Sequence, residues 1–320
     1  SQRLTGARWS ASLRRVPEAF AAILPAASVL LLVVLLGRHY LFPWSRPGAF
    51  AHEPSLAGKI AWFQAPFTYL RMGAMLLVWN IFAYLFRRDS RAQDRSSGAS
   101  LFYHRRLNRS AAAFLVLFAF SFTMASYDWL LSLDTSWSST MFAVYVFAGL
   151  FVQGISGITL AVVLLSERSG YRGLTNDHKL ADLGRMLFAF STFWAYIWTC
   201  QYLLIWYGNI PDEVTHYVTR TSAPWLGLFL LNVVLNWGVP FCLLMTGRAK
   251  SNRRILKVVT VTLLAGHWLD LYLLVVPAVA PSPRIGIWEL GIFAGYAALA
   301  WLLFTRGLRE APPLPLHDPM

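Results

Sequence analysis

Eight long apolar segments restrict the folds open to this sequence. They lie near residues 18–36, 67–86, 110–131, 138–165, 184–207, 223–246, 254–276 and 285–304. Roughly 20 apolar residues, rising about 1.5 Å each, carry a helix across the hydrocarbon of a bilayer. Because 57% of the residues are hydrophobic and only 13% are charged, we predict an all-α polytopic membrane protein with about eight transmembrane helices.

The basic residues predict how these helices are oriented. Of the 28 Lys and Arg residues, 22 fall in the two tails and in the second, fourth and sixth connections, and five fall on the opposite side. Cytoplasmic segments are enriched in Lys and Arg, so both termini are predicted to be cytoplasmic. The net charge of +13 is thereby explained without nucleic acid. We divide the chain into a cytoplasmic tail 1–17, a four-helix bundle 18–165, a cytoplasmic linker 166–183, a second four-helix bundle 184–304 and a cytoplasmic tail 305–320.

Several cofactor chemistries have no sequence support. The two cysteines, Cys200 and Cys242, lie far apart inside predicted spans, and there is no Cys-x-x-Cys motif. Covalent haem, an iron–sulfur cluster and structural zinc are therefore unsupported. Only His267 lies deep within a span, whereas a membrane b-type haem needs two facing histidines. We predict that this chain binds no metal and no redox cofactor, and we assign it no catalytic residue.

Five ionisable residues inside the spans are the candidates for function. The direction of each span places Arg71, Asp128, His267, Asp270 and Glu289 in the outer half of the membrane. Charges there are costly and mark proton or ion pathways. His267 and Asp270 are three residues apart, hence on one helix face. We interpret the set as a proton pathway, with His267 and Asp270 as carriers, Asp128 as the outlet acid and Arg71 as its counter-charge.

These residues also have structural alternatives. Arg71 and Glu289 can be interfacial anchors, and Asp128 can pair with Arg71 to hold the bundle together. His267 can be a packing residue. Four amides inside the spans are interpreted as helix-packing groups or, alternatively, as the lining of a cavity; they are Gln153, Gln201, Asn232 and Asn236.

The predicted outer connections are aromatic and acidic. A tight turn at 126–137 joins two spans without any Lys or Arg. We predict a docking surface for extrinsic partners at Asp134, Trp137, Asp212 and Glu213. The Trp- and Pro-rich loop 39–66 is expected at the outer interface or against a partner, with an ordinary packed loop as the alternative.

Several runs of the sequence resemble a known family. They are Phe122-Thr-Met-Ala-Ser-Tyr-Asp-Trp-Leu-Leu-Ser-Leu-Asp134, Phe193-Trp-Ala-Tyr196, Gln201-Tyr-Leu-Leu-Ile-Trp-Tyr-Gly-Asn-Ile-Pro-Asp-Glu213, Pro240-Phe241 and Asp270-Leu-Tyr272. Together they resemble the F subunit of bacterial alternative complex III, an NrfD-like membrane protein. Family members usually have ten spans, so two N-terminal helices are expected to be absent or to lie outside this sequence.

The resemblance implies a non-haem subunit of a quinol:cytochrome c oxidoreductase, or of one with another electron acceptor, in the bacterial inner membrane. Its implied partners are a homologous NrfD-like subunit, which is the better candidate for quinol oxidation, and extrinsic multihaem cytochrome c and iron–sulfur subunits. Menaquinol or another quinol would be the substrate of the complex. Proton conduction and subunit docking are the expected roles of this chain. A purely structural scaffold and a stand-alone secondary transporter remain the alternatives.

Overall fold

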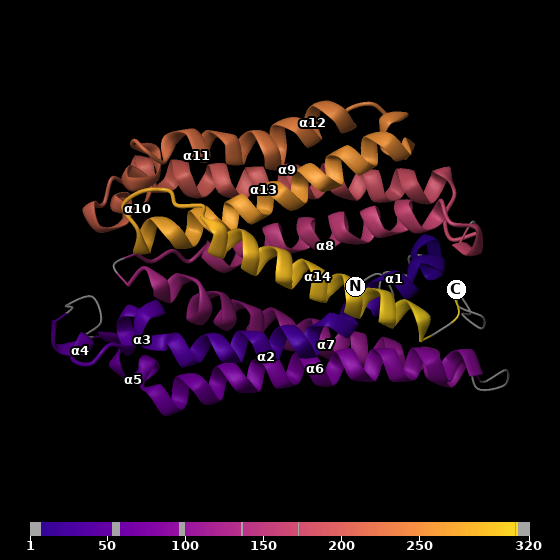
Figure 1. Cartoon of the computed structure of the whole chain (residues 1–320), viewed down its shortest axis with the longest axis horizontal. Helices are drawn as coiled ribbons and strands as arrows, with labels where there is room; N and C mark the ends of the chain where they lie inside the picture. Colours follow the sequence, from indigo (N-terminus) through magenta and orange to yellow (C-terminus); the bar gives the residue numbers. More distant parts are fainter. Residues whose placement is uncertain are drawn as a thin grey trace.

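The computed structural model describes residues 8–52, 58–95, 100–135, 137–171, 173–310 and 312. Across these residues the chain forms helices joined by short connections, with no β-strand (Figure 1). Seven helical segments are long and apolar enough to cross a bilayer: Ala11–Leu41, Ala65–Arg95, Leu101–Leu133, Phe142–Ser166, Leu226–Leu244, Arg253–Val279 and Ile287–Arg309. The predicted all-α polytopic membrane architecture is confirmed at this level.

The first segment is built from short helices placed end to end. They are α1 (Arg15–Phe20), α2 (Leu24–Val34) and α3 (Arg38–Leu41), joined by single turns of 3-10 helix. Pro25 lies in the first turn of α2, where its missing N–H costs no helical hydrogen bond. Two long helices, α6 (Ala65–Arg95) and α7 (Ser100–Trp129), then pack side by side.

The predicted fifth span is the helix α9 (Asp177–Gly208), which is 32 residues long but is not among the seven segments. Its length is sufficient for a membrane crossing. Much of its apolar surface comes from Trp and Tyr, whose polar N–H and O–H groups make them less hydrophobic than Leu or Val. The eighth crossing therefore stays a prediction.

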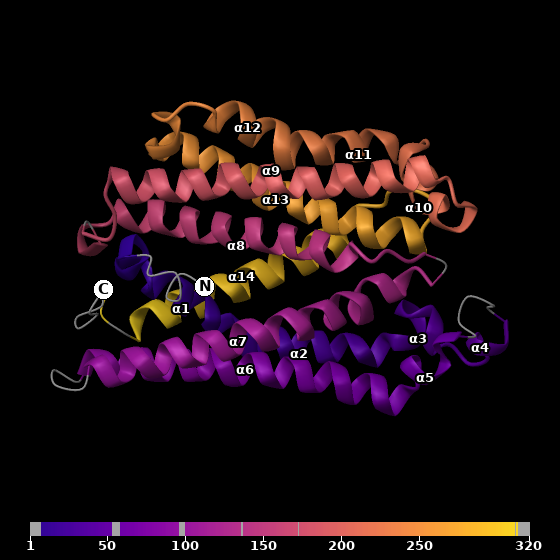
Figure 2. The same ribbon diagram turned by 180° about the vertical axis from the view of Figure 1, so that it is seen from behind.

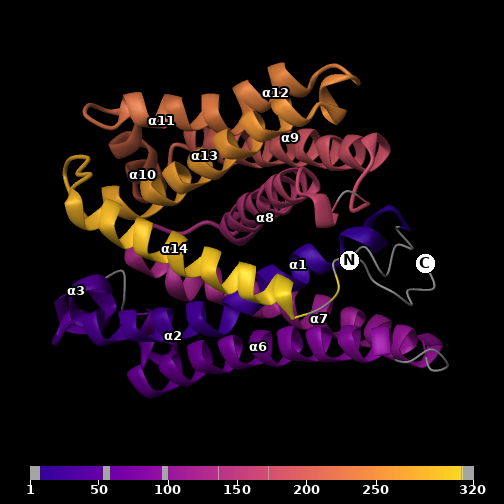
Figure 3. The same cartoon turned by 45° about the vertical axis from the view of Figure 1, so that its right-hand side comes forward.

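Helix contacts cross the boundary between the predicted halves 18–165 and 184–304, and the division into two four-helix bundles stays a prediction. The helix α8 (Phe142–Ser166) packs mainly against α9 and α13 (Arg253–Val279), on the side where α11 (Leu226–Val233) and α12 (Val239–Leu244) complete the layer (Figure 2). The last helix, α14 (Ile287–Arg309), returns to α1 (Figure 3). Small residues on α8, including Ala148 and Ser156, are buried and allow close contact with helices on both sides.

The connections gather at the two ends of the helical layers. The short helices α4 (Ala49–His52), α5 (Ile60–Phe63) and α10 (Pro211–Thr221) lie at one end, while the α8–α9 connection and the last turn of α14 lie at the other (Figure 1). This separation agrees with the alternation of basic and non-basic connections in the sequence. The cytoplasmic position of the basic end stays a prediction.

A core of the loop 39–66 packs on the chain itself, whereas most of its described residues, including Tyr40 and Trp62, are exposed. Trp44 is buried in a cluster with Phe42, Phe63 and Met72, and its ring stacks on Phe63 at 5.0 Å between centroids. This is the packed-loop alternative for these residues. Residues 53–57 lie outside the described part of the chain.

A buried ion network ties α1 to α6 at the basic end. Arg15 pairs with Asp94 and, at 2.6 Å between Nη1 and Oε2, with Glu18. Arg14 donates a 2.9 Å hydrogen bond to Gln93. Each of the two arginines is less than a tenth exposed, so this network fixes the entry of the chain into its first helix.

Candidate functional site

The helix α13 places Asp270 inside the protein through its own periodicity. Asn252 caps the helix by accepting N–H bonds from Arg254 and Ile255, and the buried positions that follow recur every three or four residues. Asp270 falls on that buried stripe, and only 5% of its surface is exposed. The helix α13 packs against α8, α11 and α12, so the carboxylate lies between packed helices.

Two neutral side chains hold the Asp270 carboxylate. The Tyr145 hydroxyl of α8 donates a hydrogen bond to Oδ1, and the Asn232 amide of α11 donates a second one to the same oxygen at 2.8 Å. No Lys, Arg or His within the described residues forms an ion pair with Asp270. A buried acid with hydrogen-bond donors but no cation can gain or lose a proton without breaking an ion pair.

A π-helical turn brings the amides into place. Between α11 and α12, residues Val234–Gly238 form this turn, and Asn236 donates a 2.7 Å hydrogen bond to Asn232 Oδ1. The side chain of Asn236 reaches α13 at Gly266, where an added Cβ would lie 2.5 Å from Asn236 Oδ1. Single π-turns in helices commonly occur at functional sites. Here the turn points the amide pair at Asp270.

Replacing Gly266 with Ala is expected to destabilise the protein by about 1–3 kcal/mol, because the new methyl group displaces Asn236 from a fully packed site. Thermal unfolding of the purified protein measures the effect. The matched control is Gly154→Ala in α8, where no atom lies within 4 Å of the added Cβ. That control should be neutral or slightly stabilising. Equal unfolding temperatures for the two variants would contradict the close packing at Gly266.

His267 is buried near Asp270 but is not bonded to it. The two residues share the buried face of α13, as their spacing predicts, yet neither ring nitrogen of His267 has a hydrogen-bond partner within the described residues. The ring meets Trp194 edge to face at 5.5 Å and lies beside Gly149. A direct proton transfer between His267 and Asp270 therefore has no hydrogen bond to follow in this arrangement.

A small cavity extends from Asp270 toward α10. Its volume is about 20 Å³, enough for one water molecule. Its polar lining is Tyr145, Gln201, Arg220, Asn232 and Asp270 together with His216. The amides Gln201, Asn232 and Asn236, for which packing and a cavity lining were both open, meet at this cavity or beside it. The cavity leads from the acid to the helix that covers the predicted outer end.

Asp128 and Arg71 form a closed ion pair elsewhere in the protein. Arg71 of α6 donates from Nε to Asp128 Oδ2 at 2.6 Å and from Nη2 to Oδ1 at 2.9 Å. Trp62 adds an indole hydrogen bond to Oδ1 at 2.9 Å, and Asp128 is fully buried. Such bidentate geometry locks the carboxylate. This ion pair agrees with the structural alternative stated for Asp128 and Arg71. It joins α6 to α7 and is separate from the site around Asp270.

Glu289 closes the first turn of its own helix. Its carboxylate accepts a 2.8 Å hydrogen bond from the backbone N–H of Gly286, the residue that precedes the first turn of α14. The side chain is exposed and lies on a different helix from Asp270 and Asp128. The five ionisable residues thus do not form a single cluster.

The predicted docking residues have different environments. Trp137 is buried and stacks on His216 at 3.7 Å between ring centroids, so its expected exposure at the docking surface is corrected. Asp134 is half-buried and lies 3.3 Å from His216 Nδ1. Glu213 lines a pocket, and the side chain of Asp212 lies outside the described part. Trp137 is hidden because α10 folds over the 126–137 turn.

The α10 helix is fastened by buried polar groups. Arg220 donates hydrogen bonds to the backbone oxygens of Leu273 at 2.8 Å and His216 at 2.7 Å. Burial lowers the pKa of His216 to about 4; the hydrogen bond with Asp134 opposes this change, and the charge of Arg220 reinforces it. Burial also lowers the pKa of Arg220 to about 10. His216 is therefore neutral at neutral pH when α10 is docked.

Acidification is expected to loosen α10. A detached His216 titrates near its ordinary pKa of about 6.5, so the detached state binds more protons between pH 6.5 and pH 4. Stability is full above that window and falls through it by about 3 kcal/mol in total. Tryptophan fluorescence during thermal unfolding, at about pH 7.5 and about pH 4.5, measures this loss. In His216→Phe, which preserves the ring stack on Trp137, the difference should shrink; an unchanged difference would contradict the assignment.

Sequence reasoning did not single out Tyr145 or Arg220. Tyr145 was hidden among the aromatic residues of an apolar run, although a Tyr in such a run needs a partner for its hydroxyl. Arg220 was counted only as an outer basic residue. Its position one α-helical turn after His216 was the available signal.

No family model matches the sequence, and no curated protein is significantly similar to it. Within the described residues, no group of three or more His, Cys, Asp or Glu side chains is arranged to hold a metal ion. The side chains around Asp270 are therefore the basis for a functional assignment, together with the sequence motifs described above.

Proposed function

We propose that this chain is a non-haem membrane subunit of a quinol-oxidising electron-transfer complex of the alternative complex III type, in which Asp270 conducts protons toward the outer side. The observation that carries the proton role is the environment of Asp270. This carboxylate is buried, pairs with no cation among the described residues and accepts hydrogen bonds from Tyr145 and Asn232. Membership of the complex is supported by the sequence runs that resemble its F subunit.

The chemistry follows from the geometry. A proton on the Asp270 carboxyl group can pass to a water molecule in the adjoining cavity, which reaches His216 and Arg220 on α10. The carboxylate then accepts another proton, and its two neutral donors stabilise the charge in the interval. Electron transfer would take place in partner subunits. His267 contributes a neutral, buried ring next to this site, without a bond to Asp270.

The structural scaffold is the second candidate, and a specific observation favours it. The buried pairs Arg71–Asp128 and Arg15–Asp94 each join two different helices, and in each the carboxylate is paired with an arginine. In our proposal these pairs hold the helices together while Asp270 exchanges protons. Asp128 is thereby assigned a structural role, and Arg71 supplies its counter-charge.

Purification of the tagged chain from native membranes tests membership of the complex. We expect it to co-purify with subunits that show c-type haem absorption and quinol oxidation. The separated chain should show no Soret band, because a membrane b-type haem needs two axial histidines and His267 is the one histidine deep within a predicted span. A chain that purifies alone, with neither haem nor quinol oxidation in any fraction, would contradict this part of the proposal and favour the transporter.

A further inference from the structure

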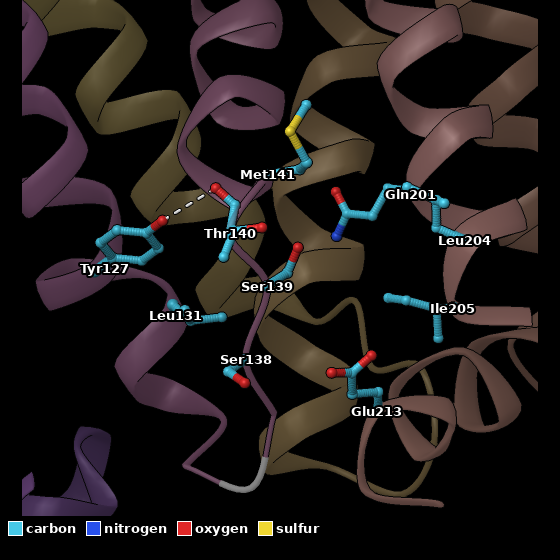
Figure 4. Close-up of a pocket in the computed structure, with 10 residues that line it drawn as sticks. All are labelled: Tyr127, Leu131, Ser138, Ser139, Thr140, Met141, Gln201, Leu204, Ile205 and Glu213. Atoms are coloured by element: carbon cyan, nitrogen blue, oxygen red, sulfur yellow. Dashed lines mark hydrogen bonds between the residues drawn. The ribbon is translucent and has the colours of Figure 1, made fainter. Parts of the chain in front are cut away.

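A pocket separate from the Asp270 cavity opens at the same end of the protein. It has a volume of about 410 Å³ and lies between the end of α7, the 138–141 segment, α9 and α10 (Figure 4). This volume is in the range of small-molecule sites. Gln201 is the one residue that also lines the Asp270 cavity. The pocket is therefore a second candidate site for a ligand.

One side of the pocket presents hydrogen-bond acceptors. Gln201 is 5% exposed, its Oε1 has no hydrogen-bond partner in the part of the chain that the structure describes, and its amide points into the pocket (Figure 4). Glu213 lies on the same side, and its carboxylate has no ion pair or hydrogen bond within the described residues. None of the ten lining residues is Lys or Arg. An unpaired carboxylate beside an unsatisfied buried carbonyl favours a cationic group that donates hydrogen bonds.

The opposite side presents hydroxyl groups and apolar side chains. Ser138 and Ser139 face the acceptors across the pocket (Figure 4). Leu131 and Leu204 add apolar surface, and Leu204 is 66% exposed at the rim. The pocket thus offers acceptors for a cation, hydroxyl donors for an anion and an apolar exit next to a long apolar helix.

We propose that this pocket binds the head group of a phospholipid with a primary ammonium, such as phosphatidylethanolamine. The ammonium faces Glu213 and Gln201, the phosphate faces the hydroxyls of Ser138 and Ser139, and the acyl chains leave past Leu204. A quaternary ammonium has no N–H to donate, so phosphatidylcholine should bind less well. Free amines such as ethanolamine also carry an ammonium group, but they have no acyl chains to contact the apolar residues at the rim.

The test uses the purified protein in phosphatidylcholine nanodiscs that contain a photoactivatable phosphatidylethanolamine. We expect labelling within residues 127–141 and 201–213, and about tenfold less labelling in Glu213→Gln, because a charge-assisted hydrogen bond is lost. Gln201→Leu, of similar volume, should also label less. The matched control is Asp182→Asn on the same helix as Gln201; the half-buried carboxylate of Asp182 pairs with Arg185, and this variant should label normally.

Three results would overturn the proposal. They are unchanged labelling in both Glu213→Gln and Gln201→Leu, equal labelling by a photoactivatable phosphatidylcholine, and displacement of the lipid by free ethanolamine at comparable concentration. The helical content of each variant is measured alongside, and Gln201→Leu decides the outcome if Glu213→Gln does not fold. Proton conduction by Asp270 is tested separately, so either proposal can fail alone.

Discussion

Replacing Asp270 with Asn is expected to lower the number of protons moved per electron to the value that quinol chemistry alone provides. Asn has nearly the same shape and can accept the hydrogen bonds from Tyr145 and Asn232, but it does not titrate. In the complex proposed above, the variant should stay assembled, because Asp270 forms no ion pair with a described residue that the change would leave unpaired. The measurement is the proton-to-electron ratio of the reconstituted complex, with quinol turnover recorded in the same vesicles.

The control for this experiment separates conduction from structure. Asp128→Asn removes another buried acid of the same end, but this one is locked by Arg71. We expect that variant to lose stability or assembly, and any complex that does assemble should keep its proton-to-electron ratio. If Asp270→Asn keeps the ratio in a fully assembled complex, the proton role of Asp270 is contradicted and the scaffold interpretation is favoured.

Replacing Arg71 with Gln is expected to destabilise the protein by about 3–5 kcal/mol, because it leaves the fully buried Asp128 without its counter-charge. The contact of the guanidinium with the Trp62 ring, 3.9 Å from its centroid, is lost as well. Thermal and denaturant unfolding in detergent provide the measurement. The double variant Arg71→Gln/Asp128→Asn should recover part of the loss, since no uncompensated charge remains.

A matched arginine tests whether the ion pair is the cause. Arg38 lies over the Tyr69 ring at 5.2 Å and is not seen to pair with a carboxylate within the described residues. Arg38→Gln should cost about 1 kcal/mol or less. A similar loss in Arg38→Gln and Arg71→Gln, or no recovery in the double variant, would show that the Arg71–Asp128 pair is not the source of the stability.

The environments of Asp270 and Asp128 explain why their expected results differ. Sequence position placed both in the outer half of a span and made both candidates for proton transfer. The structure gives one a Tyr and an Asn, and the other an Arg and a Trp. Neutral donors leave a carboxylate free to titrate, whereas a bidentate guanidinium fixes its charge. The side chains that bond each carboxylate thus decide its role, and the spacing of residues within one helix does not identify those side chains.

The sequence by itself determined the helical membrane class and the separation of basic and non-basic connections. The helical class follows because a bilayer requires each spanning segment to satisfy its own backbone hydrogen bonds. The separation of the connections follows from the positions of Lys and Arg along the chain. Local spacing also predicted that His267 and Asp270 share a face. Only the tertiary structure decided that Tyr145, 125 residues away in the chain, bonds Asp270, and that α10 buries Trp137. These contacts depend on which helix faces lie opposite each other. The residue pattern of one helix shows which face is buried, but it does not show which other helix packs against that face.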